Sequence, residues 1–466
     1  MTGRHMVVIG GGLAGITSAI GLREAGFEVT LLEARPRLGG AATSFPRGAL
    51  VIDNGQHVFL RCCTAYQDLL ARLGVAGLVR LQQRFDVSVL APAACDGATA
   101  EPGPAVRSAR LCRTGLPGPL HLMRALAGYP LLAPAERLRV ARAALGLRRV
   151  DPAGNGVDDV RFGDWLAARG QTDRVRRLLW DLFIVSALNI AGDEASLALA
   201  ATVIKTALLG GRDAADIGTA TVPLGELHDQ AARAALARLG VRVLLSARAE
   251  AVLRAPGGAF AVHLPEHPPE LAPADGLVLA VPPDQAGALA GPLLSEAQHW
   301  SGLGGSPIVN VHVVYDRPVT DLPFAAVVNS PVQWVFDKTV QAGVRGGQYL
   351  AVSLSAADDY IDMPVARLRE LFLPALEQVF PSAEAATITD FFVTRERRAT
   401  FRQAPGTAAL RPGSATGVPG LVLAGAWTDT GWPDTMEGAV RSGHTAVQEL
   451  TRDIAGRPVA LAAAAT

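Results

Sequence analysis

The stretch Met6–Ala34, "MVVIGGGLAGITSAIGLREAGFEVTLLEA", decides the fold. Its two apolar runs flank a Gly-rich turn and a helix-like run, which predicts a strand, a helix and a second, parallel strand. Gly10, Gly12 and Gly15 form a Gly-x-Gly-x-x-Gly turn before the helix, and Glu33 ends the second strand about twenty residues later. In this context the turn predicts a dinucleotide-binding site.

Each residue of this motif has a physical reason. Gly10 permits the tight turn, Gly12 lets the backbone approach a pyrophosphate, and Gly15 lets the helix pack closely on the strand. The free N–H groups at the helix N-terminus attract phosphate charge. Glu33 can accept hydrogen bonds from both hydroxyls of a ribose. The motif alone does not distinguish NAD from FAD.

Composition excludes several functional classes. The 466 residues contain 43 acidic and 43 basic side chains, so no overall field attracts nucleic acid. The length predicts two or three structural units. The four cysteines (Cys62, Cys63, Cys95 and Cys112) lack metal-site spacing, so no metal is expected. No apolar run reaches about 18 residues, and a strand beginning at Met6 does not fit a signal peptide.

The rest of the chain changes character several times. Residues 91–119 are rich in Pro, Gly and Ala, and we expect a loop with irregular strands there. Residues 120–207 look helical, and 307–354 alternate like an antiparallel sheet. A helix at 365–379 and a loop then precede a closing strand at 421–423.

A second Gly pair indicates which cofactor the chain binds. Gly39-Gly40 follows Glu33 in "EARPRLGGAATS", which resembles the flavoprotein pattern of the amine oxidase and phytoene desaturase superfamily. The stretches 240–252, 275–283 and 421–443 are similar, in order, to the family's adenine-contacting strand, returning strand and C-terminal flavin motif. The resemblance implies FAD and an α/β fold. That fold has a Rossmann-like FAD-binding domain of the glutathione-reductase-2 type and a discontinuous substrate domain of antiparallel sheet plus helices.

The resemblance also suggests domain boundaries. We expect an FAD-binding domain built from 1–80, 220–284 and 412–455. An antiparallel-sheet substrate domain covers 285–411, and a helical, substrate- and membrane-facing subdomain covers 85–219. Residues 456–466 are expected to fray.

The family's cofactor contacts carry over residue by residue. The backbone of Ala249 is expected at the adenine, and the N–H groups of the helix beginning at Met436 and Glu437 at the flavin. The full expected set is Gly10, Gly12, Leu13, Ala14, Gly15, Glu33, Ala34, Arg35, Gly39, Gly40, Ala41, Asn54, Gly55, Gln56, His57, Ala249, Ala280, Gly425, Ala426, Thr435, Met436 and Glu437.

A finer resemblance rests on "DNGQHVF" (53–59), "LWDLFIVSALN" (179–189), "TVPLGELH" (221–228) and the Trp-containing end motif. Together they resemble the squalene-associated FAD-dependent desaturases, or hydroxysqualene dehydroxylases. This implies reductive dehydroxylation of hydroxysqualene to squalene in hopanoid or isoprenoid biosynthesis, with hydride from reduced flavin and protonation of the leaving hydroxyl. The alternatives are a carotenoid-type desaturase, a flavin-dependent isomerase and a non-catalytic lipid-binding flavoprotein.

Four side chains are candidates for contact with the substrate. His57 is a candidate proton donor or hydroxyl ligand, and a polar turn packing the FAD domain is the alternative. Asn189 can bind the substrate oxygen or end its helix. Trp427 and Trp432 can line an apolar substrate tunnel, or simply pack. Glu437 is more typical of a first-turn helix acid than of a catalyst.

Two positions depart from the family pattern. Ala41 stands where the family usually has Arg, and Ala426 stands where it usually has Asp. Loss of one cation and one anion leaves the local charge unchanged. Our hypothesis is that other donors or water replace them.

Partners follow from the substrate and from charge. Residues 134–150 carry Arg on one side and apolar residues on the other, which fits a solvated face or a membrane-docking helix. We expect a cytoplasmic protein, peripheral to the inner face of the membrane, that takes up a hydrophobic triterpene. No second dinucleotide motif follows a later strand, so the unidentified electron donor is a diffusible reductant or a partner protein.

Overall fold

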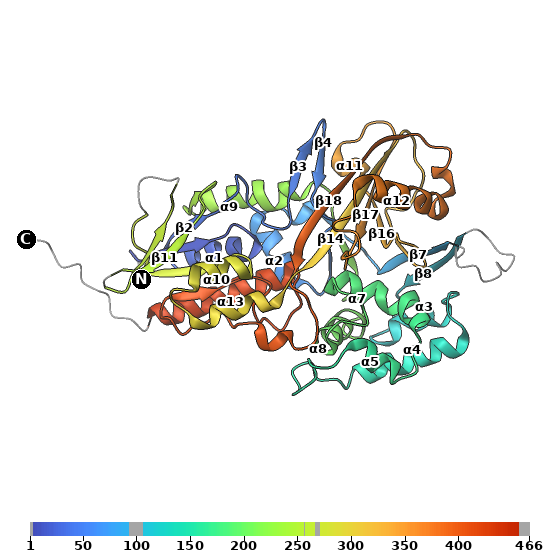
Figure 1. Ribbon diagram of the computed structural model, residues 1–466, viewed down its shortest axis with the longest axis horizontal. Coiled ribbons are helices and arrows are strands. Elements are labelled where there is room, and N and C mark those ends of the chain that lie inside the picture. The colour runs from blue at the N-terminus through green and yellow to red at the C-terminus, as the bar shows by residue number, and fades with distance from the viewer. Residues whose placement is uncertain (1–2, 93–105, 256, 266–270, 456–466) are drawn as a thin grey trace, which may run out of the picture.

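The computed structural model describes residues 3–92, 106–255, 257–265 and 271–455 (Figure 1). The expected frayed tail and Cys95 lie outside these residues. The molecule has two lobes, which lie side by side along its long axis. A parallel sheet with α1, α9, α10 and α13 forms one lobe, and a larger sheet with the helices α3–α8 and α12 forms the other.

The first lobe is organised by a five-stranded sheet in the order β10-β2-β1-β13-β19, in which every neighbouring pair is parallel. Its strands are β1 (His5–Ile9), β2 (Glu28–Leu32), β10 (Arg242–Leu244), β13 (Gly276–Leu279) and β19 (Leu421–Leu423). The predicted opening is confirmed, because α1 (Leu13–Glu24) connects β1 to β2. Three distant parts of the sequence thus build one sheet, and the closing helix α13 (Met436–Ala455) packs against α1.

The second lobe is organised by a seven-stranded sheet in the order β18-β14-β17-β16-β15-β7-β8. Its strands are β7 (Asp86–Pro92), β8 (Val106–Cys112), β14 (Ser306–Tyr315), β15 (Phe324–Val327), β16 (Trp334–Asp337), β17 (Gln348–Leu354) and β18 (Ile388–Thr400). All pairs are antiparallel except β15 with β7. The predicted helix at 365–379 is α12 (Val365–Val379), and Leu368, Phe372 and Leu376 pack it on one sheet face.

Two sequence expectations about this sheet are wrong. We expect loop with irregular strands at 91–119, of which 93–105 lie outside the described residues. The described part contains β8, which pairs regularly with β7 and extends the substrate sheet rather than the helical subdomain. The loop expected after Val379 contains β18, the longest strand. Its sequence "ITDFFVTRERRAT" is rich in charge, and its side chains are mostly half-buried. Pairing with β14 along its length, rather than apolar periodicity, therefore makes it a strand.

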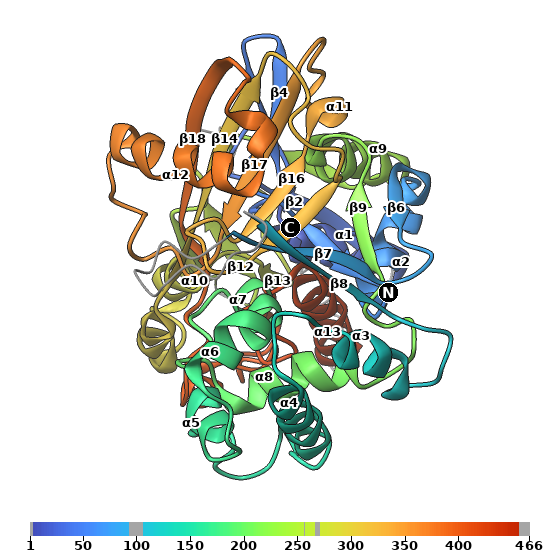
Figure 2. The same cartoon turned by 90° about the vertical axis from the view of Figure 1, so that its right-hand side faces the viewer.

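The helices expected at 120–207 are confirmed. They are α3 (Met123–Ala127), α4 (Pro134–Leu147), α5 (Phe162–Ala167), α6 (Asp173–Val175), α7 (Asp181–Leu188) and α8 (Leu197–Val203). Figure 2 shows α4, α5 and α8 on the opposite side of the molecule from α12 and the large sheet. Within the described ranges, no helix is both long enough and apolar enough to cross a membrane.

Small elements connect the lobes. Strands β5 (Val58–Leu60), β6 (Val79–Leu81) and β9 (Ile217–Ala220) form one sheet, and β3 (Ser44–Arg47) pairs with β4 (Leu50–Asp53). The remaining elements are α2 (Thr64–Leu73), α9 (Ala231–Arg238), β11 (Ala251–Arg254), β12 (Phe260–His263), α10 (Pro283–Ala290) and α11 (Thr339–Ala342).

Candidate functional site

The first glycine turn fits only glycine at two of its positions. Gly10 has a φ of +111°, and a Cβ there would lie 2.2 Å from the carbonyl oxygen of Ala280. A Cβ on Gly15 would lie 1.8 Å from the carbonyl oxygen of Gly10. The turn is therefore held between β1, α1 and the end of β13. This is the close packing predicted for Gly15, and it places Ala280 beside the motif.

The second glycine pair packs directly on the first turn. The N–H of Gly39 donates to the carbonyl oxygen of Gly11 at 2.9 Å. Gly40 has a φ of +59°, and a Cβ there would lie 2.9 Å from the Cα of Gly12. Gly12 precedes α1, and no side chain caps that helix. The start of α1, at Leu13 and Ala14, is therefore without a side-chain cap, and its N–H groups fit the predicted pyrophosphate.

Glu33 is buried beside this turn. One carboxylate oxygen accepts from the N–H of Gly11 at 2.7 Å, and the other accepts from the N–H of Arg35 at 2.8 Å. The N–H of Ala247 donates to the carbonyl oxygen of Glu33, so the chain that follows β10 and leads to Ala249 passes close by. A carboxylate offers about four acceptor sites. Glu33 therefore retains capacity for ribose hydroxyls, and its placement fits an adenosine end.

Asn54 ties the second glycine turn to the large sheet. Its side chain donates to the carbonyl oxygen of Ala41 at 2.8 Å and accepts from the N–H of Thr43 at 3.0 Å. Its carbonyl oxygen accepts from Asn310 Nδ2 and Thr394 Oγ1, each at 3.2 Å. Because Asn310 lies on β14 and Thr394 on β18, Asn54 connects the predicted cofactor turn to the substrate lobe.

The residues 224–229 hold the same turn from the other side. His228 Nδ1 donates to the carbonyl oxygen of Ala42 at 2.9 Å, and its Nε2 accepts from the hydroxyl of Tyr66 at 2.8 Å. The N–H of Leu38 donates to Asp229 at 2.9 Å. Burial lowers the pKa of His228, which agrees with this neutral tautomer. Sequence reasoning used "TVPLGELH" only as a family signature and did not assign His228 this role.

An ion pair between Lys338 and Asp53 joins the two lobes near the second glycine turn. Lys338 Nζ lies 2.9 Å from Asp53 Oδ2. The other carboxylate oxygen of Asp53 accepts from Ser44 Oγ at 2.7 Å and from the N–H of Leu224 at 2.9 Å. Both charges are therefore compensated despite burial. Lys338 was not predicted, and its only sequence signal is its rarity, since the chain contains one other lysine, Lys205.

His57 follows β4 and lies beside Gly55. Burial, followed by the neighbouring His228, lowers its pKa to about 4. The imidazole is therefore neutral at pH 7. A neutral imidazole has one N–H donor and one acceptor nitrogen, so the role of His57 as proton donor or hydroxyl ligand stays a prediction.

Asn189 ends α7 as a helix cap, the second of the two roles expected for it. It follows α7 with a φ of +50°. Its amide nitrogen donates to the carbonyl oxygen of Ser306 at 2.9 Å and to Thr400 Oγ1 at 3.1 Å, and its oxygen accepts from the N–H of Ala356 at 2.7 Å. The side chain holds α7 on the sheet, because both amide N–H groups and one lone pair of the oxygen are used.

Arg411 organises the loop between β19 and α13 and was missed by sequence reasoning. It is 8% exposed. Its guanidinium donates to the carbonyl oxygens of Ala426 at 3.1 Å, Trp427 at 3.2 Å and Trp432 at 2.9 Å, and also to that of Thr428. Ala426 therefore lies in a loop whose carbonyls face a buried cation. Nothing in its local sequence distinguishes Arg411 from the many surface arginines.

The two tryptophans of this loop differ in how deeply their side chains are buried. Trp427 is 4% exposed, its indole N–H donates to the carbonyl oxygen of Val281 at 3.0 Å, and its ring centre lies 5.3 Å from that of Trp300. The expectation that Trp427 lines a tunnel is wrong, because the side chain belongs to the packed core. Trp432 is half-buried, with the guanidinium of Arg441 4.6 Å from its ring centre.

The start of α13 (Met436–Ala455) is held by two side chains, one in its own first turn and one in the residue before it. Thr435 Oγ1 accepts from the N–H of Gly438 at 3.2 Å and so caps the helix. The Glu437 side chain is buried and turns away to α2, where it accepts from the N–H groups of Ala65 at 3.1 Å and Tyr66 at 2.8 Å. The carboxylate is therefore used by α2, and the predicted cofactor contact of Glu437 is through its backbone N–H. The backbone at Met436 and Glu437 begins α13 as predicted.

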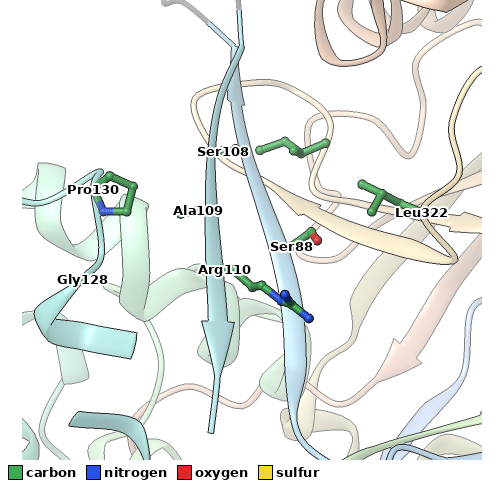
Figure 3. A pocket seen from close by; sticks show the side chains of 8 residues that line it. Ser88, Ser108, Ala109, Arg110, Gly128, Pro130 and Leu322 are labelled. Carbon is green, nitrogen blue, oxygen red and sulfur yellow. The ribbon is translucent and has the colours of Figure 1, made fainter. Parts of the chain in front are cut away.

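A surface hollow of about 540 Å³ lies on the β7–β8 hairpin, away from this site (Figure 3). None of its lining residues is in the predicted cofactor or substrate set. They are Ser88, Leu90, Ser108, Ala109, Arg110, Gly128, Pro130 and Leu322. Among the described residues, no group of His, Cys, Asp and Glu is arranged to hold a metal ion.

The buried His312 predicts acid sensitivity. Burial, followed by Arg47, lowers its pKa to about 3. The unfolded chain therefore binds a proton below about pH 6.5 that the folded protein does not. Stability should fall as the pH falls through this range, by about 2 kcal/mol between pH 7 and pH 5 from this group. Denaturant unfolding at both pH values should show a smaller difference for His312→Gln, and an unchanged difference contradicts the prediction.

The comparisons with known proteins agree with this architecture. The family model for flavin containing amine oxidoreductase matches residues 13–451. A hydroxysqualene dehydroxylase of Rhodopseudomonas palustris is 31% identical over 457 residues, covering 94% of this chain and 96% of the relative. A zeta-carotene desaturase of Arabidopsis thaliana is 24% identical, covering 95% of this chain and 84% of the relative.

Solved structures share the fold. The cyclohexylamine oxidase of Brevibacterium oxydans superposes with a TM-score of 0.69 at 17% identity, covering 97% of this chain and 99% of that one. The glycine turns, Glu33 and the open start of α1 fit FAD, and the chain is an FAD-dependent oxidoreductase. It belongs to the flavin containing amine oxidoreductase family and, within that family, to the hydroxysqualene dehydroxylases.

Proposed function

We propose that this protein converts hydroxysqualene to squalene by reductive dehydroxylation, as a step of hopanoid-type isoprenoid biosynthesis. The observation that carries the proposal is similarity to a hydroxysqualene dehydroxylase along nearly the whole chain, at 31% identity. The stretch 53–59, part of the finer resemblance, also lies where the two lobes meet.

The reaction replaces a carbon–oxygen bond by a carbon–hydrogen bond. Reduced FAD supplies the hydride when it is bound. The hydroxyl leaves as water after it receives a proton, so the site must hold the alcohol and exclude bulk solvent. The glycine turns and Glu33 hold the dinucleotide in this proposal. The polar residues that follow β4 hold the reacting end of a substrate that is otherwise apolar.

The chain lacks Arg at position 41, and we propose that Arg35 serves in its place. Its guanidinium donates to the carbonyl oxygen of Gly40 at 3.3 Å and is therefore at the turn where the family's arginine acts.

A diffusible reductant or a partner protein supplies the electrons. This second proposal rests on the absence of a second dinucleotide motif in the sequence.

The alternative is a carotenoid-type desaturase, favoured by the 24% identity to zeta-carotene desaturase. A desaturase removes hydrogen from a hydrocarbon and runs the cofactor in the opposite direction. Anaerobic incubation of the reduced enzyme with hydroxysqualene, followed by mass analysis, should yield squalene. Conversion of zeta-carotene or phytoene by the oxidised enzyme, with no squalene formed by the reduced one, contradicts the proposal. A protein that purifies without flavin and binds none contradicts both.

We also propose that α4 docks on an anionic membrane surface. Leu138 and Leu145 are 53% and 52% exposed and lie two helical turns apart, with exposed Arg142 between them. No ion pair to Arg142 occurs among the described residues. Leu120 and Met123 add exposed apolar surface on the neighbouring segment. Arg137 is not part of this face, because its guanidinium donates to the carbonyl oxygens of Leu132 and Ala127.

Co-sedimentation with vesicles tests this docking. The wild type should bind phosphatidylglycerol vesicles, and Leu138→Glu/Leu145→Glu should reduce binding at least about tenfold, because two carboxylates replace apolar contacts. Leu253→Glu is the matched control, since Leu253 is 55% exposed on β11 at the other end of the molecule (Figure 1). Equal binding by the double variant and the wild type contradicts the proposal.

A further inference from the structure

A polar corner lies where the two lobes meet, and part of its hydrogen-bonding capacity is unused. It consists of Asn310 on β14 and His57, and Gln56 precedes His57 in the chain after β4. A Cβ added to Gly55 would lie 3.2 Å from His57 Nε2 and 3.8 Å from Asn310 Nδ2. His57 and Asn310 therefore lie on the same side of Gly55.

Asn310 lies on the face of β14 that is directed toward the cofactor lobe. Its neighbours Val309 and Val311 alternate to the other face and pack in the core beneath α12. Asn310 is 1% exposed, and its Nδ2 donates to the carbonyl oxygen of Asn54 at 3.2 Å. That bond fixes which end of the amide is the nitrogen.

The oxygen of this amide accepts no hydrogen bond within the described part of the chain. The next polar side chain on the same face contrasts with it. His312 uses both ring nitrogens, toward Tyr349 and Thr394. An unpartnered buried carbonyl costs roughly 1–3 kcal/mol. A buried, oriented and unpartnered acceptor is therefore a reason to expect a ligand at Asn310 Oδ1.

Gln56 supplies the complementary group. Its Nε2 is buried and, among the described residues, has no acceptor. A hydroxyl is both a donor and an acceptor. An alcohol can donate to Asn310 Oδ1 and accept from Gln56 Nε2, whereas a hydrocarbon can do neither. Neutral His57 beside them adds no charge to this corner at pH 7.

We propose that Asn310, together with Gln56, binds the hydroxyl of the substrate and so distinguishes a triterpene alcohol from its hydrocarbon product. The inference rests on the proposed function and deepens it. Asn310 binds the oxygen of the carbon–oxygen bond that breaks. Squalene dissociates because it has no group that can form hydrogen bonds with Asn310 Oδ1 and Gln56 Nε2. A site built to bind a hydroxyl discriminates strongly against the analogue that lacks it.

Ligand titrations of the oxidised, FAD-loaded enzyme test the assignment without turnover. Hydroxysqualene and squalene are added separately, and the change in flavin absorbance gives each Kd. The wild type should bind hydroxysqualene at least about tenfold more tightly than squalene. Asn310→Leu should abolish this preference while leaving the Kd for squalene and the flavin spectrum unchanged. Gln56→Leu should weaken the preference as well. Because Gln56 is less buried than Asn310, this variant keeps the test valid if Asn310→Leu fails to fold.

Thr394→Val is the matched control. It removes the other hydrogen bond to the Asn54 carbonyl, together with the one to His312 Nε2, and leaves Asn310 Oδ1 in place, so the preference should persist. A preference retained in both Asn310→Leu and Gln56→Leu overturns the inference, as does loss of FAD or an altered flavin spectrum in ligand-free Asn310→Leu. A wild type that neither converts nor binds hydroxysqualene removes the proposed function itself. If the wild type converts hydroxysqualene and the variants still prefer it to squalene, only the role of Asn310 is refuted.

Discussion

Replacing Gly15 by Ala will abolish FAD binding. The added Cβ would lie 1.8 Å from the carbonyl oxygen of Gly10, a backbone atom held between β1 and the end of β13. Neither group can move without separating α1 from the sheet. Overpacking of this kind costs about 3 kcal/mol, equivalent to a loss of at least about a hundredfold in FAD affinity. The flavin content of the purified protein and titration of the apoprotein with FAD provide the measurement.

The control for this variant is Gly77→Ala. A Cβ on Gly77 would have no atom within 4 Å, so this protein should retain its flavin. A Gly15→Ala protein that purifies with a full complement of FAD would show that the turn relaxes without cost, and the close packing inferred for α1 would be wrong.

Replacing Arg411 by Ala will loosen the loop 425–435. Four carbonyl oxygens lose one buried cationic donor, and each hydrogen bond to a charged group contributes roughly 1.5–3 kcal/mol. The contributions are not additive, and we expect a decrease of about 3–5 kcal/mol in the free energy of unfolding. The affinity for FAD should fall with it, because this loop leads into the start of α13.

Two variants separate this role from general destabilisation. Arg411→Lys keeps the charge but cannot reach four acceptors, so it should restore only part of the stability. Arg345→Ala removes an exposed arginine and should change neither property. Denaturant unfolding and FAD titration measure both. Unchanged stability and FAD affinity in Arg411→Ala would mean that the loop is held by its other contacts.

Three side chains show what a motif leaves undecided. For Trp427, Glu437 and Asn189 the sequence left both a role in the site and a structural role open. Each side chain is used by a distant partner: Val281, the start of α2, and β14 with β18. A motif predicts where the backbone goes, but the direction of a side chain depends on residues hundreds of positions away. Ala426 shows the same limit, since its environment depends on Arg411.

The sequence by itself determined the strand–turn–helix opening, the acid at its second strand and the order of the flavoprotein segments. The opening depends on short-range properties, namely glycine sterics and apolar periodicity, and the order of the segments is what the family resemblance implied. Only the tertiary structure decided which polar groups meet. Asn54 touches Asn310, Asp53 touches Lys338, and Tyr66 touches His228. The partners in these pairs are separated by 256 residues between Asn54 and Asn310 and by 162 between Tyr66 and His228. No local pattern encodes such pairings, because they form only when packing of the sheets and helices brings the two lobes together.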